Sequence, residues 1–234
     1  MKDDPANTQT RVLEAASTIF AARGFRGTTV ADICRQAGAN IAAVNYYFGS
    51  KKKLYREAWR HAHFSMLKAC PPDGAVPADA TAELRLRGRI RGLLQRALAG
   101  DGREFRIVNH EMTNPTGLLA EVVHDSLGPL RQALREILGQ LLGDRADERV
   151  IHWCELSVVA PCLHLVRRRH MPPPAAKAEP QEAFAQPTME DLEKMVDHFT
   201  SFALAGIRDI RRQLEASRPG QAVDRAAPAT FSNS

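Results

Sequence analysis

The segment from Asn40 to Lys53 brings together side chains that can contact a nucleic acid. Asparagine can read a base edge or bind a phosphate, tyrosine hydroxyls can bind phosphate oxygens, and alanine methyl groups can touch thymine methyls in the major groove. Five such residues stand almost side by side: Ala42, Ala43, Asn45, Tyr46 and Tyr47. Three consecutive lysines follow them. This combination is unusual for a solvated helix face, and it suits a helix that enters a DNA groove.

A short helix must precede this segment if the segment is to be held in place. Thr28 or Thr29 can cap the N-terminus of that helix, because a threonine oxygen accepts hydrogen bonds from first-turn amides. Gly38 can end the helix, since a tight reversal needs a residue that tolerates positive φ. We expect this helix to run through Val30, Ile33 and Ala37.

A second short helix carries the candidate contact residues. Asn40 can cap it, and we expect its buried face to consist of Ile41, Val44 and Phe48. Two short helices separated by a glycine turn are typical of a helix-turn-helix unit. Such a unit needs a third helix across its back, which residues 8–23 can supply.

The lysines after the second helix open a further helix at Ser50. Its free N-terminal amides and the Lys51 ammonium together favour binding of a phosphate. Taken singly, Tyr46 and Tyr47 could be core aromatics and the lysines a solvated face. Their combination in this order and spacing favours DNA binding.

This part of the chain resembles the TetR-type bacterial transcriptional regulators. The resemblance covers about residues 8–60 and rests on Ala15-Ala16, Phe20, Gly24-Phe25, Thr28-Thr29-Val30, Ile33, Ala37-Gly38, Val44 to Lys51, and Leu54. The run from Asn45 to Lys51 is similar to that of the CecR-type subgroup, in which a histidine usually stands where this chain has Tyr47. The family's commonest form has tyrosine at the position of Asn45 and a small polar cap at that of Asn40.

The resemblance implies a homodimeric repressor that binds a palindromic operator in double-stranded DNA and is released by a small-molecule effector. The resemblance implies that three residues at the edge of the groove contact phosphates or bases: Thr28, Thr29 and Asn40. Those that would lie nearest the bases are Ala42, Ala43 and Asn45. The DNA backbone would be bound by Tyr46, Tyr47 and Lys51, with Arg26 as an additional phosphate contact. The departures at Asn40, Asn45 and Tyr47 affect the operator sequence rather than the fold.

The charge distribution agrees with a DNA-binding N-terminal third. The 234 residues contain 32 Lys and Arg and 27 Asp and Glu, a net charge of +5. Residues 1–70 hold 11 of the basic and 5 of the acidic residues, a net of +6, and the rest of the chain carries −1. With 44% hydrophobic and 25% charged residues, the composition excludes a wholly disordered or collagen-like chain.

Helical periodicity continues along the rest of the chain, over residues 84–98, 118–142, 150–166 and 192–214. We therefore predict an all-α protein of about nine helices. Its expected parts are a helix-turn-helix domain (1–70), a larger helical effector-binding and dimerisation domain (71–216) and a disordered tail (217–234), with a proline-rich loop over 171–187. The helices at 148–166 and 189–214 are candidates for a four-helix dimer interface, although their apolar residues would equally suit an intrachain core.

The larger part of the chain offers few chemical motifs. His110 and Glu111 are the candidate effector contacts, although each could be an ordinary surface or core residue. The arginines between residues 85 and 91 are expected to be structural or solvated. The His152/His164 and Cys154/Cys162 pairs are too widely spaced for compact zinc ligation, so we expect no metal, no cofactor and reduced core cysteines.

Two broader expectations complete the prediction. No nucleophile, base and orienting group occur in a recognisable pattern, so an enzyme is not expected. A polar N-terminus and the lack of an apolar run of about 18 residues predict a cytoplasmic protein without membrane contact. A DNA-binding accessory protein that has no effector remains the alternative function.

Overall fold

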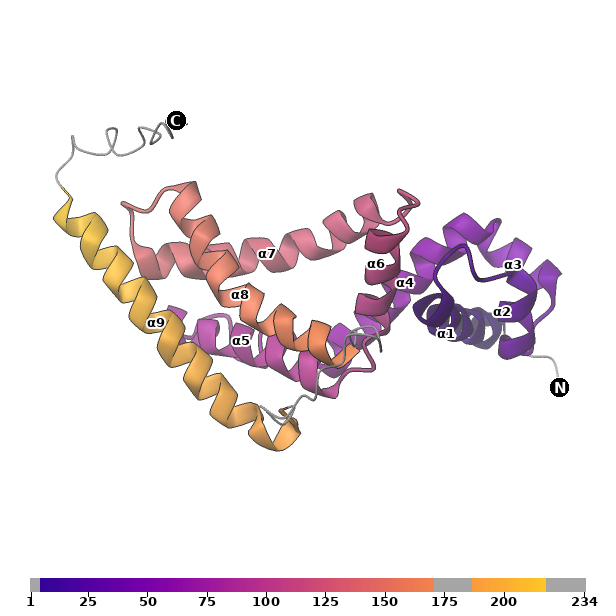
Figure 1. The fold of residues 1–234 in the computed structure, drawn as a ribbon, viewed down its shortest axis with the longest axis horizontal. Coiled ribbons are helices and arrows are strands. Elements are labelled where there is room, and N and C mark those ends of the chain that lie inside the picture. The colour runs from indigo at the N-terminus through magenta and orange to yellow at the C-terminus, as the bar shows by residue number, and fades with distance from the viewer. Residues whose placement is uncertain (1–4, 171–186, 218–234) are drawn as a thin grey trace, which may run out of the picture.

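The computed structural model describes residues 5–170 and 187–217, and these residues form nine α-helices, one 3-10 helix and no strand (Figure 1). The predicted all-α class is therefore confirmed. The loop expected over residues 171–187 lies outside the described residues except for Pro187, and the expected tail lies outside them beyond Ser217. The helices are α1 Pro5–Arg23, α2 Val30–Ala37, α3 Ile41–Phe48, α4 Lys51–Ala69, α5 Ala82–Ala99, α6 Arg103–Thr113, α7 Ala120–Leu142, α8 Glu148–His170, η2 Met189–Asp191 and α9 Leu192–Ala216.

Helices α1 to α4 form one end of the molecule, with the short α2 and α3 outermost (Figure 1). Their shared core contains Phe20, Ile33, Val44 and Tyr55, whose side chains are fully buried or nearly so. The chain reverses after α1 at Gly24 and after α2 at Gly38, and both glycines have positive φ, +67° and +61°. Because residues with a Cβ rarely adopt this conformation, glycine is what allows the two tight turns.

The core of this end includes side chains from later helices. Ile107 of α6, together with Leu119 and Val122 at the start of α7, belongs to the same buried cluster as α1 to α4. The hydrophobic core therefore crosses the predicted boundary between residues 70 and 71. Because this core is closely packed, a change in the position of α6 or α7 is expected to displace the helices that carry the candidate DNA contacts.

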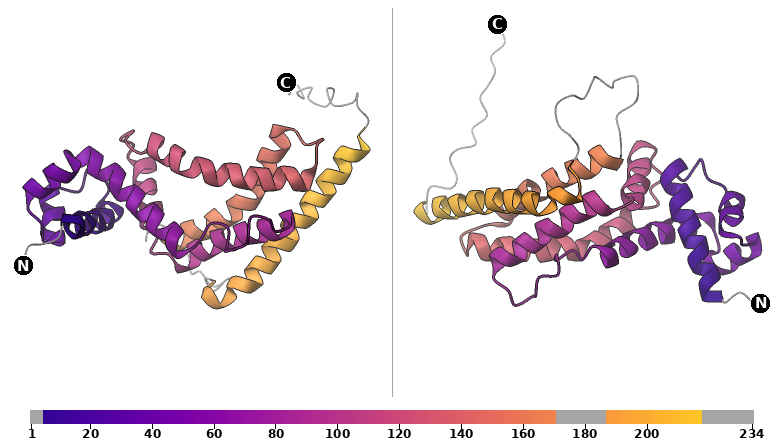
Figure 2. Two further views of the ribbon diagram at one scale, coloured as in Figure 1. Left: turned by 180° about the vertical axis from the view of Figure 1, so that it is seen from behind. Right: turned by 90° about the horizontal axis from the view of Figure 1, so that it is seen from below.

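Helices α5, α7, α8 and α9 form the larger body around a second core. Its fully buried side chains include Leu94 of α5, Leu138 of α7 and Val196 of α9. Helices α8 and α9 lie together on one face of this body, in front of α5 and α7 in Figure 1 and along its upper side in the right panel of Figure 2.

The segment after α4 runs directly over α5. A Cβ on Gly88 would lie 2.1 Å from the Asp73 carbonyl oxygen, and one on Gly92 would lie 2.6 Å from that of Pro71. No side chain fits at either position, so the two glycines fix the approach of residues 71–76 to α5.

Helix α8 is long and apolar enough to cross a membrane by length and composition, contrary to the sequence expectation. Only 28% of its most apolar stretch of 18 residues is buried. The inner side of α8 nevertheless packs into the second core through Cys154, Val158 and Cys162. All four cysteines are buried and free, and burial raises the pKa of the Cys162 thiol to about 12.

Candidate nucleic-acid interface and ligand cavity

Two side-chain caps fix the short helices of the helix-turn-helix. The Thr29 hydroxyl accepts a hydrogen bond from the Asp32 amide at 3.1 Å, and the Asp32 carboxylate accepts one from the Thr29 amide at 3.2 Å. The Asn40 side-chain oxygen accepts from the Ala43 amide at 2.7 Å. These caps satisfy first-turn amides that would otherwise be left without partners and so define where α2 and α3 begin.

Helix α3 presents most of the predicted contact residues to solvent. Tyr46 is 83% exposed, Ala42 and Asn45 are exposed, and Ala43 is half-buried. Tyr47 is half-buried and packs against the core, with its ring 5.1 Å from that of Tyr46. The outer surface of α3 thus combines small residues, an amide and a phenol, which is the set needed for close approach to a groove.

Two expectations for this region are wrong. Ile41, expected on the buried face, is 53% exposed, because the first residue of α3 lies at the outer end of the turn and only Val44 and Phe48 point into the core. Thr28 is buried, and its hydroxyl donates to the Gly24 carbonyl at 2.7 Å. The Thr28 side chain is thus used to fix the turn after α1 and is not open to a phosphate. Arg26, in the same turn, is exposed.

Lys51 stands in the first turn of α4, where backbone amides point outward. Its ammonium lies 4.3 Å from the centroid of the Phe25 ring, a cation–π contact that holds the side chain beside the turn after α1. Partial burial lowers the pKa of Lys51 from its usual value. The neighbouring Ser50 hydroxyl accepts from the Lys53 amide at 3.2 Å and caps the helix.

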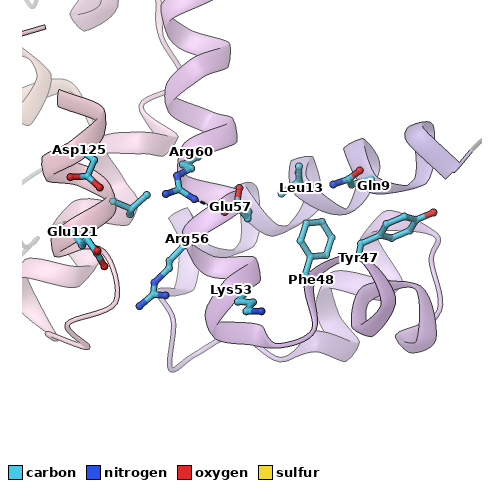
Figure 3. Close-up of a pocket in the computed structure, with 11 residues that line it drawn as sticks. Gln9, Leu13, Tyr47, Phe48, Lys53, Arg56, Glu57, Arg60, Glu121 and Asp125 are labelled. Atoms are coloured by element: carbon cyan, nitrogen blue, oxygen red, sulfur yellow. Dashed lines mark hydrogen bonds and ion pairs between the residues drawn. The ribbon is translucent and has the colours of Figure 1, made fainter. Parts of the chain in front are cut away.

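A polar cleft of about 500 Å³ separates α4 from α7 beside this surface (Figure 3). It is lined on the α4 side by Lys53, Arg56 and Arg60 and on the α7 side by Glu121 and Asp125, and Arg60 is paired with Glu57 of its own helix at 2.6 Å. Arg56 also donates to the Leu118 carbonyl at 2.9 Å, which ties α4 to the segment before α7. Charges of both signs and wide access to solvent make this cleft a poor site for an apolar ligand.

A second, mostly apolar cavity of about 330 Å³, partly open to solvent, lies in the larger body. It is bounded by α5, α7 and α8, with Phe105 of α6 and Pro72 closing it. Ten of its fourteen lining residues are apolar or glycine, and the other four are charged: Arg89, Arg96, Arg131 and Glu155. This is the composition of a small-molecule site, in which a few polar groups orient an otherwise apolar ligand.

The predicted effector contacts His110 and Glu111 do not line this cavity. The Glu111 carboxylate accepts from the Thr116 amide at 2.8 Å and from the Tyr55 hydroxyl at 3.4 Å. The His110 ring packs beneath Gly24, 3.1 Å from where a Cβ on that glycine would lie. Both residues therefore connect α6 to the DNA-binding end.

Sequence reasoning also missed a buried ionic network that joins α4, α5 and α6. Glu104 accepts from His63 at 2.7 Å and from Arg96 at 2.6 Å, and all three side chains are buried. Arg96 also lines the ligand cavity, so the network reaches from the cavity wall to α4. The residues are 8 and 41 positions apart along the chain from Glu104, and no local pattern signals their contact. Within the described ranges, no three His, Cys, Asp or Glu side chains are grouped so that they could hold a metal ion.

Comparison with known proteins is consistent with this geometry. The family model of bacterial regulatory proteins of the tetR family matches residues 12–58. That of the C-terminal domain of the HTH-type transcriptional dual regulator CecR matches residues 82–207, more than half of the chain.

Individual relatives point the same way. The dual regulator CecR of Shigella flexneri is 32% identical over 64% of this chain and 71% of its own length. The transcriptional repressor AcnR of Corynebacterium efficiens is 30% identical over 40% of this chain, and the match spans only 44% of AcnR. Among solved structures, AibR in complex with isovaleryl coenzyme A and operator DNA shares the fold, with a TM-score of 0.56 over 84% of this chain and 97% of that chain at 17% identity. The chain therefore belongs to the TetR family of bacterial transcriptional regulators, with a C-terminal domain of the CecR type.

Proposed function

We propose that the protein is a homodimeric repressor that binds a palindromic operator and is released from it by a small molecule in the apolar cavity. The observation that carries the DNA-binding part is the exposed face of α3, held by the Asn40 cap and flanked by Lys51. In this proposal the operator contacts are Arg26, Thr29, Asn40, Ala42, Ala43, Asn45, Tyr46, Tyr47 and Lys51. The protein acts in the cytoplasm, where its operator lies.

The dimer follows from what one recognition helix can read. A single helix contacts only a few base pairs, and two helices about one DNA turn (~34 Å) apart on a two-fold axis read a useful site. Helices α8 and α9 share one face of the molecule (Figure 1), and each carries a large exposed apolar side chain, Trp153 on α8 and Phe202 on α9. These residues support the predicted interface of α8 and α9, in which two copies form a four-helix contact.

Release by an effector requires that the ligand bind one conformation better than the other. The cavity lies between α5, α7 and α8, and its wall residue Arg96 is linked through Glu104 to His63 of α4. A ligand that shifts α5 or α7 would thereby move α4 and the recognition helix. AibR, whose structure contains both isovaleryl coenzyme A and operator DNA, supports the view that this fold can hold both kinds of partner.

Lys51→Ala tests the assigned DNA interface. Removing one phosphate contact should weaken binding on every DNA sequence and flatten the plot of log K against log salt by about one unit. The measurement is a DNA titration at several salt concentrations. Lys68→Ala is the matched control, because Lys68 is an exposed lysine at the opposite end of α4. An unchanged slope for Lys51→Ala would contradict the proposed contact.

The alternative is a DNA-binding accessory protein without an effector. A thermal-shift screen of small molecules, combined with DNA retardation, separates the two functions. A compound that stabilises the protein and abolishes retardation supports the repressor. DNA binding that is indifferent to every ligand supports the accessory protein.

A further inference from the structure

The formal charges of the residues that line the apolar cavity do not sum to zero. Three arginines and one glutamate line it, which gives a formal excess of two positive charges among otherwise apolar or glycine residues. A cation that is removed from water is costly unless it is paired with an anion or is hydrogen-bonded. The partner of each arginine therefore decides what the cavity can bind.

Two of the three arginines have carboxylate partners. Arg131 donates to Glu155 at 2.8 Å, and Arg135 donates to the same carboxylate at 3.1 Å. Burial opposes ionisation of Glu155, but hydrogen bonds from these arginines and from His152 outweigh it and lower its pKa. The Glu155 carboxylate is thus already paired with Arg131 and Arg135. Arg96 is paired with Glu104 at 2.6 Å.

Arg89 has no such partner. Its guanidinium donates to the backbone carbonyls of Pro72, at 3.3 Å, and of Leu130, and no carboxylate of the described ranges forms an ion pair with it. Burial lowers its pKa, the charge of Asp73 opposes this effect, and the charges of Arg85 and Arg96 add to it. Two carbonyl dipoles satisfy donors, and the charge of Asp73 acts on Arg89 without forming an ion pair with it, so the positive charge has no directly paired anion.

An unsatisfied donor lies in the same wall. The Nε of Arg96 is buried and makes no hydrogen bond, although Arg96 is only 6% exposed. Buried donors without partners are rare in folded proteins and call for a specific explanation. An acidic group inside the cavity would provide one.

We propose that the cavity binds an apolar molecule that carries a single carboxylate, with Arg89 as the residue that pairs with the carboxylate and Arg96 Nε as a further donor. This inference rests on the proposed function only in taking the same cavity as the effector site. Arg89 contacts both Pro72, just after α4, and Leu130 of α7. An anion on Arg89 therefore acts where the segment leaving the DNA-binding end meets the ligand-binding body.

The test uses ligands that differ only in their polar group. Octanoate, octanol and octylamine form one series, and naphthoate, naphthylmethanol and naphthylmethylamine form a second. Titration calorimetry of the full-length protein without DNA should show, in at least one series, the carboxylate binding at least tenfold more tightly than the alcohol and the amine. Arg89→Met should remove this preference, measured as the ratio of the carboxylate and alcohol affinities of the same variant. Alcohol binding that persists shows that the cavity is still folded. Arg89→Lys should restore part of the preference.

Three results would overturn the proposal. They are an alcohol or amine that binds as tightly as the carboxylate in both series, an unchanged preference in Arg89→Met, and the failure of both carboxylates to bind. If Arg89→Met also loses alcohol binding, the preference is measured with Arg89→Gln, and the same criteria apply. The calorimetry is done without DNA and therefore tests only the ligand class. If the carboxylate binds but does not release DNA in a separate retardation assay, effector-controlled release is contradicted and the proposed ligand class is not. If an uncharged compound binds in the cavity and releases DNA while the carboxylates do not bind, the proposed ligand class is contradicted and effector-controlled release is not.

Discussion

Asn40 has two roles that substitution can separate. Its side-chain oxygen caps α3 through the Ala43 amide, and the residue is exposed at the end of the recognition helix, where DNA phosphates would lie. Asparagine and aspartate are similarly good caps, and a negative charge suits a helix N-terminus. Only the aspartate, however, would repel a phosphate.

We therefore expect Asn40→Asp to keep the stability of the wild type within about 0.5 kcal/mol, because the cap is retained. The same substitution should weaken DNA binding at least tenfold in a titration at moderate salt. Asn40→Ala should instead lose about 1 kcal/mol of unfolding free energy in urea, because the Ala43 amide loses its partner. Wild-type DNA affinity in Asn40→Asp would mean that no phosphate lies near this residue.

At the scale of single helices, the ionic network of Glu104 holds α4, α5 and α6 together. The carboxylate pairs with Arg96 of α5 and with His63 of α4, and neither partner has appreciable contact with solvent. Removing one member of such a group leaves a buried charge without compensation, which costs far more than the intact network contributes.

Glu104→Gln should accordingly lower the free energy of unfolding by about 3 kcal/mol, seen as a large drop in the urea midpoint. Glu57→Gln is the control, since Glu57 forms a partly exposed ion pair with Arg60 within α4 and its loss should cost less than about 1 kcal/mol. Similar losses in the two variants would show that the network is no more important than a surface pair.

The helices themselves could be predicted from the sequence, whereas this network could not. Caps and glycine turns are local, so Thr29, Asn40 and Gly38 are recognisable from the residues around them. Ile41 misled the prediction because its apolar type fits the helical period, but a first-turn residue at the outer end of a turn need not face the core. His63, Arg96 and Glu104 meet only through the packing of three helices, as do the residues of the ligand cavity. Arg89 belongs to an arginine run that the sequence predicts to be structural or solvated, with nothing to indicate a place in a cavity wall.

For the whole molecule, the deciding question is whether two copies associate through α8 and α9. Phe202 of α9 is 76% exposed, and Trp153 of the neighbouring α8 is 54% exposed. Large apolar side chains that gather on one face of a soluble protein usually mark an interaction surface. Buried area of this kind would also hold the two recognition helices at a fixed spacing.

Phe202→Glu should convert the protein to a monomer, because a two-fold interface would bury two carboxylates without partners. Sedimentation velocity at micromolar concentration measures the change directly, and DNA affinity should fall with it, since each half-site is then bound alone. Met112→Glu is the matched control: Met112 is equally exposed, at 76%, but stands on α6, away from the proposed interface. If Phe202→Glu stays dimeric, or if Met112→Glu dissociates to the same extent, the dimer does not form through α8 and α9. A wild type that is monomeric even when bound to DNA would remove the basis for a palindromic operator altogether.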